Sequence, residues 1–309
     1  MRKLQGFLFI LIFSVSAFAW DDTGHKISAE IAWRNLTPAA REKVVAVLLG
    51  APEDSGILNL LASDSRSLAA RQEQMFYTAA TWADLVRDQK FASRNKEYNR
   101  GNWHYFDTFW RDANGKMEMV SELKSDNQNA VERLFAFDKI LSDEKANAAD
   151  RGVALAWFLH LAGDIHQPLH CSGRVTEIEP TGDQGGNLFL LTPADAPKRD
   201  NLHGYWDGII SRTSPRVNDE GDSTYIARLA DDIAKKHPAK EFDGALKPGK
   251  YDDWHKEGFE IAVKEVYPSS LKRGETPSDA YRQRTKEIAE QRLALAGYRM
   301  AELFNRIFV

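Results

Sequence analysis

The sequence predicts an all-α fold. Most of the chain consists of amphipathic or apolar segments with helical spacing, separated by short stretches that contain proline or glycine. Residues 174–197 depart from this pattern, because they are rich in glycine, proline, aspartate and threonine. No low-complexity linker and no repeat of solenoid period is visible. We therefore expect a single multi-helix domain over 20–309, with a small strand or hairpin inserted near 183–192.

The first nineteen residues are expected to be a signal peptide that lies outside this domain. Arg2 and Lys3 form a basic start, and the apolar run at 7–15 is too short to span a membrane. Ala17-Phe18-Ala19 gives the small-x-small pattern of a signal-peptidase site. Cleavage before Trp20 would send residues 20–309 to the periplasm or the medium without a membrane anchor.

Caps, prolines and glycines predict the boundaries of the first helices. Thr37 is a helix cap, Pro38 suits the first helical position, and Gly50 suits the end of that helix. A long amphipathic helix is expected at 68–88, because Met75, Ala79 and others recur at helical spacing. Another helix is expected at 129–141.

The second half of the chain begins with a helix at 150–164 that is apolar on every side. Such a helix is expected to be buried at the centre of the fold, and Pro168 ends it. Residues 187–192 have the composition of a strand. Further helices are expected at 201–211, 224–236 and 252–266. The last helix is expected from Pro277, capped by Thr276, to about Asn305.

The charge of the chain limits how it can bind a polyanion. Removal of residues 1–19 takes away two of the 41 basic residues and none of the 45 acidic ones, so the net charge changes from −4 to −6. A net-negative protein does not collect nucleic acid through a broad basic surface. Bound cations would have to supply positive charge locally. Cys171 is the only cysteine, so no intrachain disulfide can form.

Histidine and aspartate residues cluster in a way that predicts a metal site. Four potential ligands fall in one short stretch: His160, Asp164, His166 and His170. His160 and Asp164 lie on one face of the apolar helix, where a charged aspartate is costly unless a cation meets it. His203 and Asp207 repeat this i, i+4 spacing. Mixed histidine and aspartate ligands without thiolates suit hydrolytic zinc sites.

Three further candidate ligands lie upstream: Asp84, His104 and His25. His25 follows Trp20 by five residues, and the amine that cleavage would create at Trp20 has a pKa low enough to bind metal as a neutral base. His166 lies off the face shared by His160 and Asp164, so a structural hydrogen bond is favoured over ligation. A single pair of histidine and aspartate one turn apart is more often a surface hydrogen bond than a site.

At these residues the chain resembles the S1/P1 nuclease family, which shares a fold superfamily with the bacterial zinc-dependent phospholipases C. The matching motifs run along the chain: Trp20-x4-His25, Thr81-Trp-Ala-Asp84, Asn102-Trp-His104-Tyr-x-Asp107, His160-x3-Asp164-x-His-Gln-Pro-Leu-His170, Asp183-x-Gly-Gly-Asn187, Asn201-Leu-His203-x2-Trp-Asp207 and Ala289-Glu290 to Arg299. Gly208 departs from the family pattern, which often has a side-chain amide there.

The resemblance implies three zinc ions per chain. The ligands of the first would be Asp84, His104, His160 and Asp164. Those of the second would be His25, the shared Asp164, and the amine and carbonyl of Trp20. Those of the third would be His170, His203 and Asp207. The resemblance further implies that Arg87 and Asp164 are catalytic and that Tyr105, Asp107 and Asn187 bind the substrate.

The implied function is that of a zinc-dependent endonuclease. It would hydrolyse single-stranded DNA and RNA to products with 5′ phosphates, would also act on 3′-nucleotides, and would work as a monomer without a stable protein partner. One alternative is a zinc-dependent phospholipase C, which typically has a glutamate in place of Asp207 and a wider spacing than that from Trp20 to His25. The other is a non-catalytic, exported zinc-binding protein, which would not need Arg87.

Overall fold

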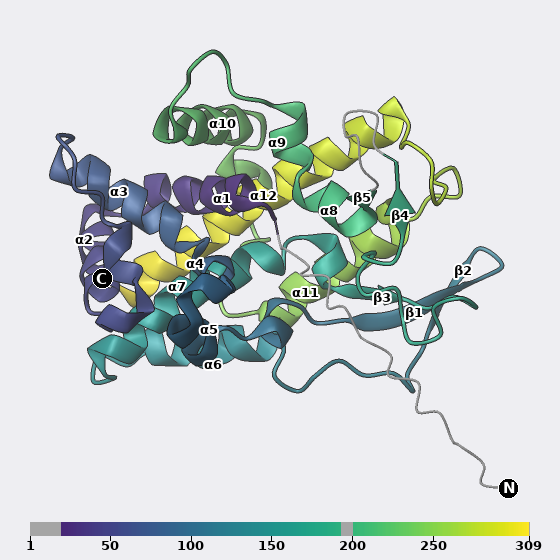
Figure 1. Cartoon of the computed structure of the whole chain (residues 1–309), viewed down its shortest axis with the longest axis horizontal. Coiled ribbons are helices and arrows are strands. Elements are labelled where there is room, and N and C mark those ends of the chain that lie inside the picture. Colours follow the sequence, from purple (N-terminus) through teal and green to yellow (C-terminus); the bar gives the residue numbers. More distant parts are fainter. Residues whose placement is uncertain (1–19, 193–199, 309) are drawn as a thin grey trace, which may run out of the picture.

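The computed structural model describes residues 20–192 and 200–308, and the expected signal peptide lies outside them. The fold class is all-α, as predicted, with short strands gathered on the right in Figure 1. The helices are α1 (Asp22–Asn35), α2 (Pro38–Leu49), α3 (Leu68–Ala79), α4 (Trp82–Leu85), α5 (Ala92–Tyr98), α6 (Ala130–Ser142), α7 (Ala148–Asp164), α8 (Leu202–Asp207), α9 (Ile209–Thr213), α10 (Asp222–Lys236), α11 (Tyr251–Ile261) and α12 (Asp279–Ile307). The strands are β1 (Thr108–Ala113), β2 (Lys116–Met119), β3 (Ser172–Arg174), β4 (Leu190–Leu191) and β5 (Asp200–Asn201).

Helices α1, α7 and α12 form the centre of the molecule. In Figure 1, α12 crosses the molecule, and both α1 and α7 pack against it. Ala29 and Trp33 of α1 belong to an apolar cluster with α2, α3, α6 and α7, whereas Ile27 and Ile31 belong to a second cluster with α8, α9, α10 and α12. Residues 154–164 of α7 are buried without interruption, as its apolar sequence predicts. Within residues 20–192 and 200–308, no helix has the length and apolar character needed to cross a membrane.

The helix ends show which caps the fold uses. The Thr37 hydroxyl accepts a hydrogen bond of 3.2 Å from the Ala40 amide, and α2 runs from Pro38 to the residue before Gly50, as predicted. The last helix begins two residues later than predicted, because Ser278 is its cap and accepts from the Tyr281 amide at 3.2 Å. Thr276, the predicted cap, instead donates its hydroxyl to the Thr192 carbonyl.

The continuous helix predicted at 68–88 is wrong, because the chain tightens between α3 and α4. The amide of Ala80 donates to Tyr77 O at 3.3 Å, and that of Thr81 donates to Thr78 O at 2.9 Å, so both bonds span three residues instead of four. The Thr81 hydroxyl reinforces the tightening with a 2.8 Å bond to Thr78 O. The amide of Asp84 donates to Thr81 O rather than to Ala80 O. The Ala80 carbonyl can therefore accept a hydrogen bond from a side chain of another helix.

Helix α1 and the β1–β2 hairpin are not among the predicted elements. The hairpin turns at Asn114-Gly115, where both residues have positive φ angles, 56° and 82°, and it pairs Trp110 with Met119. Strand β3 joins β1 in parallel, with Thr108 opposite Ser172, and thereby ties the segment after His104 to the segment after α7. The predicted strand at 187–192 is shortened to β4, which pairs antiparallel with β5. Residues 193–199, which connect β4 to β5, lie outside the described part of the chain.

Candidate metal centre

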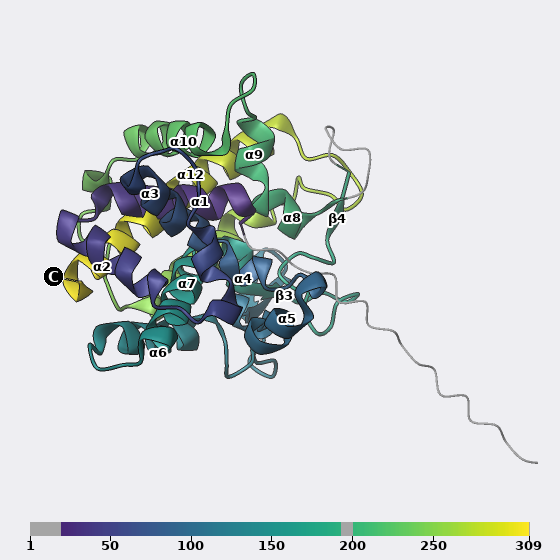
Figure 2. The same cartoon turned by 60° about the vertical axis from the view of Figure 1, so that its left-hand side comes forward.

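The candidate site is built on the end of α7. His160 and Asp164 are fully buried and one helical turn apart, with His160 Nε2 3.3 Å from Asp164 Oδ2. The Ala80 carbonyl accepts a 2.7 Å hydrogen bond from His160 Nδ1, and α4 lies against α7 in Figure 2. The break between α3 and α4 thus orients the imidazole. A proton on Nδ1 leaves a lone pair on Nε2, which is the form that binds a metal.

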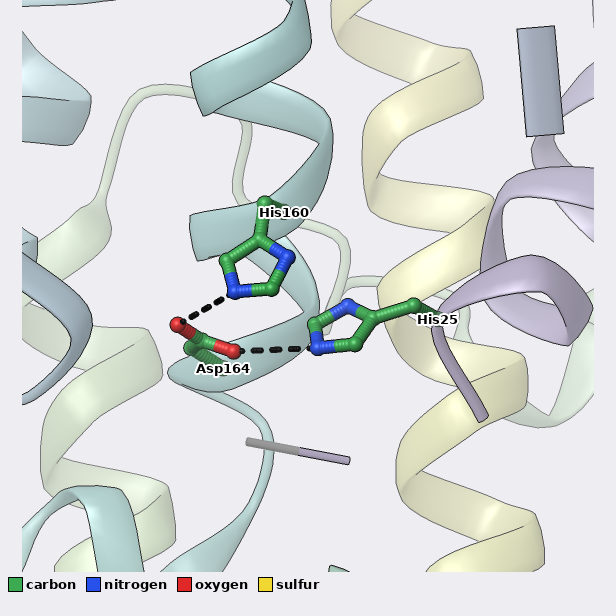
Figure 3. A group of neighbouring side chains, drawn as sticks. All are labelled: His25, His160 and Asp164. Carbon is green, nitrogen blue, oxygen red and sulfur yellow. Dashed lines mark ion pairs between the residues drawn. The ribbon is translucent and has the colours of Figure 1, made fainter. Parts of the chain in front are cut away.

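His25 of α1 meets the other oxygen of Asp164. Its Nε2 lies 3.2 Å from Asp164 Oδ1, and its ring stacks on that of His160 with centroids 4.0 Å apart and planes inclined by 17° (Figure 3). This approach depends on glycine at position 163, because a Cβ there would lie 2.7 Å from His25 Nδ1. Asp164 therefore presents each of its oxygens to an imidazole nitrogen, the arrangement needed for a carboxylate shared between two cations.

His104 and Asp84 complete this group of side chains. His104 ends a 3₁₀ turn (Gly101–His104), and its Nδ1 lies 3.1 Å from Asp164 Oδ2 and 3.0 Å from His160 Nε2. Asp84 of α4 has Oδ2 3.9 Å from His160 Nε2, while its Oδ1 accepts a 2.9 Å hydrogen bond from Arg87 Nη1. Two sets of candidate ligands result, which share His160: His25, His160 and Asp164; and Asp84, His104 and His160.

A third set of candidate ligands comes from α8 and from a 3₁₀ turn (Pro168–His170) after α7: His170, His203 and Asp207. The two Nε2 atoms lie 3.1 Å apart, and Asp207 Oδ2 lies 3.5 Å from His203 Nε2. Each ring is oriented through Nδ1, since His170 donates to His104 O at 2.6 Å and His203 donates to Gly185 O at 2.7 Å. The first of these bonds also links the third set to the group around Asp164.

Buried polar atoms in these sets lack the hydrogen bonds that burial normally demands. Within the described residues, His25 Nδ1 and Nε2, His104 Nε2, Asp164 Oδ1 and Asp207 Oδ2 have no hydrogen-bond partner. Burial lowers the pKa of His25 to about 4 and that of His104 well below its usual value, so both imidazoles are neutral. Burial also raises the pKa of Asp164 and of Asp207 well above the usual range. Neutral imidazoles bind metals, and such carboxylates ionise when a cation lies beside them, so the donor set fits metal ions.

Trp20 lies between the candidate ligands around Asp164 and those of the third set. Its buried indole donates from Nε1 to Gly163 O of α7 at 3.0 Å, and the amide of Asp21 donates to Asp207 O of α8 at 3.1 Å. The chain therefore enters the fold between the ends of α7 and α8. Ligation by the amine of Trp20 stays a prediction, because the cleavage that would create this amine concerns residues outside the described part of the chain.

Two cavities adjoin the candidate ligands, and both have His203 and Asn187 in their walls. The first cavity, of about 560 Å³, is also lined by Arg87, Tyr105 and Asp107. The second cavity, of about 980 Å³, includes Asp84 and Asp207 in its wall. The structure thus brings the four predicted substrate and catalytic residues outside the ligand sets to one cavity: Arg87, Tyr105, Asp107 and Asn187.

Several groups that orient the candidate ligands, among them the Gln167 amide and the Ala80 carbonyl, are missing from the sequence-based prediction. Gln167 Nε2 donates to Asp207 Oδ1 at 2.7 Å, and the Ala80 carbonyl holds His160. His166 is outside the three sets, because its Nδ1 donates to Ala162 O at 2.6 Å and its Nε2 accepts from Arg299 at 2.8 Å. The polar pair His166-Gln167 directly after an apolar helix is a sequence signal for such support, whereas a backbone carbonyl leaves none.

Comparison with known proteins gives consistent matches along the chain. The sequence profile of a family described as S1/P1 Nuclease matches residues 20–309. Endonuclease 1 of Arabidopsis thaliana is 26% identical, over 97% of this chain and 90% of its own length. Endonuclease 3 of the same organism is 26% identical, over 94% and 90%, respectively. Endonuclease 4 is 30% identical over 50% of each protein.

Proposed function

This chain belongs to the S1/P1 nuclease family, and on that premise we propose that it is a zinc-dependent endonuclease for single-stranded DNA and RNA. It leaves 5′ phosphates on its products, and it removes the phosphate of 3′-nucleotides at the same site. The observation that carries the proposal is Asp164, a buried carboxylate with an imidazole nitrogen within 3.3 Å of each oxygen. Such a group is costly in a protein core unless cations lie beside it.

The donor atoms support three zinc ions. We assign the first to Asp84, His104, His160 and Asp164, the second to His25, Asp164 and the backbone amine and carbonyl of Trp20, and the third to His170, His203 and Asp207. Imidazole and carboxylate ligands without thiolates are typical of hydrolytic zinc sites. When bound, zinc lowers the pKa of a water molecule to about 7 and offsets negative charge on phosphate oxygens.

Arg87 stabilises the charge that develops on the phosphate during hydrolysis. Its guanidinium lines the cavity of Tyr105 and Asp107, and its bond to Asp84 keeps it beside the candidate ligands. A guanidinium has five N–H donors, so it can hold Asp84 and a phosphate oxygen together. Its side chain is only 17% exposed, and partial exclusion of water strengthens its interaction with an anion.

Tyr105 and Asp107 give the site its preference for single strands. A base that is stacked in a duplex cannot enter the cavity, whereas an unpaired base can turn out of the strand and stack on Tyr105. Burial and the neighbouring Asp183 raise the pKa of Asp107 to about 7. In its ionised form, Asp107 accepts hydrogen bonds from the N–H groups of the base. Asn187, in the wall between the two cavities, provides an amide that can donate to the strand.

The two alternatives differ in what the cavities should contain. A phospholipase C needs apolar surface for acyl chains, but the cavity around Tyr105 is bordered mainly by polar side chains: Arg87, Gln89, Asn95, Asn99, Asp107, Gln184 and Asn187. A non-catalytic zinc-binding protein needs neither an adjoining cavity nor an arginine bound to a ligand. The nuclease therefore accounts for more of the site than either alternative.

The experiment is a comparison of substrates with zinc-loaded protein. Single-stranded DNA, the same sequence as a duplex, RNA, 3′-AMP and phosphatidylcholine are incubated in parallel, and the ends of the products are identified. We expect fast cleavage of both single strands to 5′-phosphate products and slow cleavage of the duplex. A chelator should abolish the activity, and added zinc should restore it.

A matched pair of variants tests the role of Asp164. Asp164→Asn keeps the size of the side chain but removes its charge, so we expect it to lose at least one zinc ion and several orders of magnitude in rate. Asp243→Asn makes the same change at an exposed position and should keep the zinc content and the rate of the wild-type protein. In the comparison of substrates, phosphocholine release without nucleotide hydrolysis would favour the lipase. Three bound zinc ions without hydrolysis of any substrate would favour the non-catalytic zinc-binding protein.

A further inference from the structure

A third cavity, of about 420 Å³, lies between α8, α9 and the first turns of α12. These three helices lie together at the upper right of Figure 1, and α9 packs against both of the others. The charged residues that line the cavity are Arg212, Arg282, Lys286 and Asp279. Arg212 is paired with Asp200, so the positive excess of this cavity comes from Arg282 and Lys286 against Asp279, although the chain as a whole has a net charge of −4.

The positive charges on α12 are weakly neutralised. Arg282 and Lys286 are four residues apart and therefore lie on one face of the helix. Arg282 Nη1 is 4.0 Å from Asp279 Oδ1, and the Asp279 side chain is 99% exposed. Lys286 Nζ is 3.9 Å from Glu290, which is bound more closely by Lys236. Contacts of this length on a wet surface cancel little charge, so an anion in the cavity would be attracted.

Arg212 connects this cavity to the candidate metal centre. It lines both the third cavity and the second one, whose wall includes the candidate ligands Asp207 and His203. Its pairing with Asp200 fixes the side chain across Gly208, where a Cβ would lie only 3.1 Å from Arg212 Nε. Arg212 lies in α9, which follows α8 and its last residue Asp207 after a single residue, Gly208. Arg212, although paired with Asp200, thus lies between the third ligand set and the two cations on α12.

We propose that the third cavity binds backbone phosphates of a single strand that extends beyond the bond being cut. The inference rests on the proposed nuclease function and identifies the part of a long substrate that the protein holds outside the reaction centre. A strand has a phosphate at every nucleotide, so it can meet the ligand sets, Arg212, and the pair Arg282 and Lys286 in succession. A dinucleotide is too short to do so. Long strands should therefore bind more tightly than short ones, with a larger dependence on salt.

The experiment compares the salt dependence of binding in a charge-removing variant and a matched control. A labelled single strand of twelve nucleotides with phosphorothioate linkages, which keep the charge but resist hydrolysis, is titrated with zinc-loaded protein at several salt concentrations. The variant is Arg282→Gln with Lys286→Gln. The control is Arg284→Gln, which removes one charge from the same helix at a residue that is paired with Glu265 outside the cavity.

Loss of two phosphate contacts should reduce the slope of log K against log salt by about 1.4, because each contact to a single strand contributes about 0.7. Over a tenfold rise in salt, the wild-type protein should thus lose about 25-fold more affinity than the double variant. The control should keep the wild-type slope, and all proteins should hydrolyse a dinucleotide equally. An unchanged slope in the double variant, or an equal change in the control, would overturn the inference. Failure of the wild-type protein to cleave any nucleic acid would instead refute the proposed function, while the slopes would still decide whether the cavity binds a strand.

Discussion

Gly163→Ala is expected to displace His25 from Asp164 while leaving the fold intact. A Cβ at position 163 would lie 2.7 Å from His25 Nδ1 and 3.0 Å from Cε1, and ordinary contacts begin at 3.4 Å. The imidazole must therefore move by about 0.7 Å. Bonds from nitrogen to zinc tolerate about 0.2 Å, so the second zinc ion would lose this ligand. Alanine is better than glycine inside a helix by about 1 kcal/mol, so α7 itself should not be weakened.

The measurements are the zinc content of the purified variant, its thermal melting temperature and its rate on single-stranded DNA. We expect about one zinc ion fewer per chain and a rate reduced by about 100-fold, the size of effect that a displacement near 1 Å produces in an active site. His25→Ala should lose the same zinc ion. The variant that combines Gly163→Ala with His25→Ala should be as active as His25→Ala alone, because both changes remove the same interaction.

The matched control is Gly221→Ala, since a Cβ at Gly221 meets no atom within 4 Å. This control should keep the zinc content and rate of the wild-type protein. If Gly163→Ala also kept its full zinc content and rate, His25 could not be a ligand in the position described, and the assignment of the second zinc ion would be refuted.

Three further predictions concern the support of the site and the stability of the fold. Gln167→Ala removes the hydrogen bond to Asp207 and should weaken the binding of the third zinc ion, that of His170, His203 and Asp207, by 10- to 100-fold in a competition titration with a chelator. Full chelation should lower the melting temperature of the wild-type protein, because the ligands come from distant segments of the chain; an unchanged temperature would contradict this. Burial and the neighbouring Glu73 raise the pKa of Glu30 from 4.5 to about 7, so its contribution to stability is present below pH 4.5 and is lost as the pH rises through 7. Glu30→Gln should therefore melt at a higher temperature than the wild-type protein at pH 8 but at a similar temperature at pH 4.5, and the same shift at both pH values would count against the assigned titration.

Much of the centre of the fold could be predicted from the sequence. The burial of α7 follows from a run of residues that is apolar on all sides, and the common face of His160 and Asp164 follows from helical spacing. Capping chemistry places α2 correctly, because Thr37 and Pro38 act locally. The end of α3 could not be predicted in this way, because the pattern of apolar residues continues through the break at Thr81. Hydrogen bonds over three residues, which the pattern does not encode, decide that boundary.

The β1–β2 hairpin had a local signal in Asn114-Gly115, but strand β3 pairs with β1 across a long separation in sequence. The distances within the site also depend on contacts between segments that are far apart in the sequence. Periodicity can place His160 beside Asp164, but it cannot bring His25 of α1 or His104 to the same carboxylate. Those approaches depend on the packing of α1 and α7 and on the absence of a side chain at Gly163. The resemblance to the family supplied what periodicity could not.

The position of the candidate ligands suggests why the fold can bury so much charge at its centre. Asp164 and Asp207 are carboxylates in the core, and each would cost several kcal/mol if it were ionised without a counterion. The side chains around them come from α1, α4, α7 and α8, so cations bound there would link four helices that are far apart in sequence. The chain has one cysteine, Cys171, and so cannot form an intrachain disulfide that would hold these helices together. In this protein, the metal ions proposed for catalysis would therefore also cross-link the fold. Loss of metal should loosen the packing of α1 against α7 before it affects elements remote from Asp164.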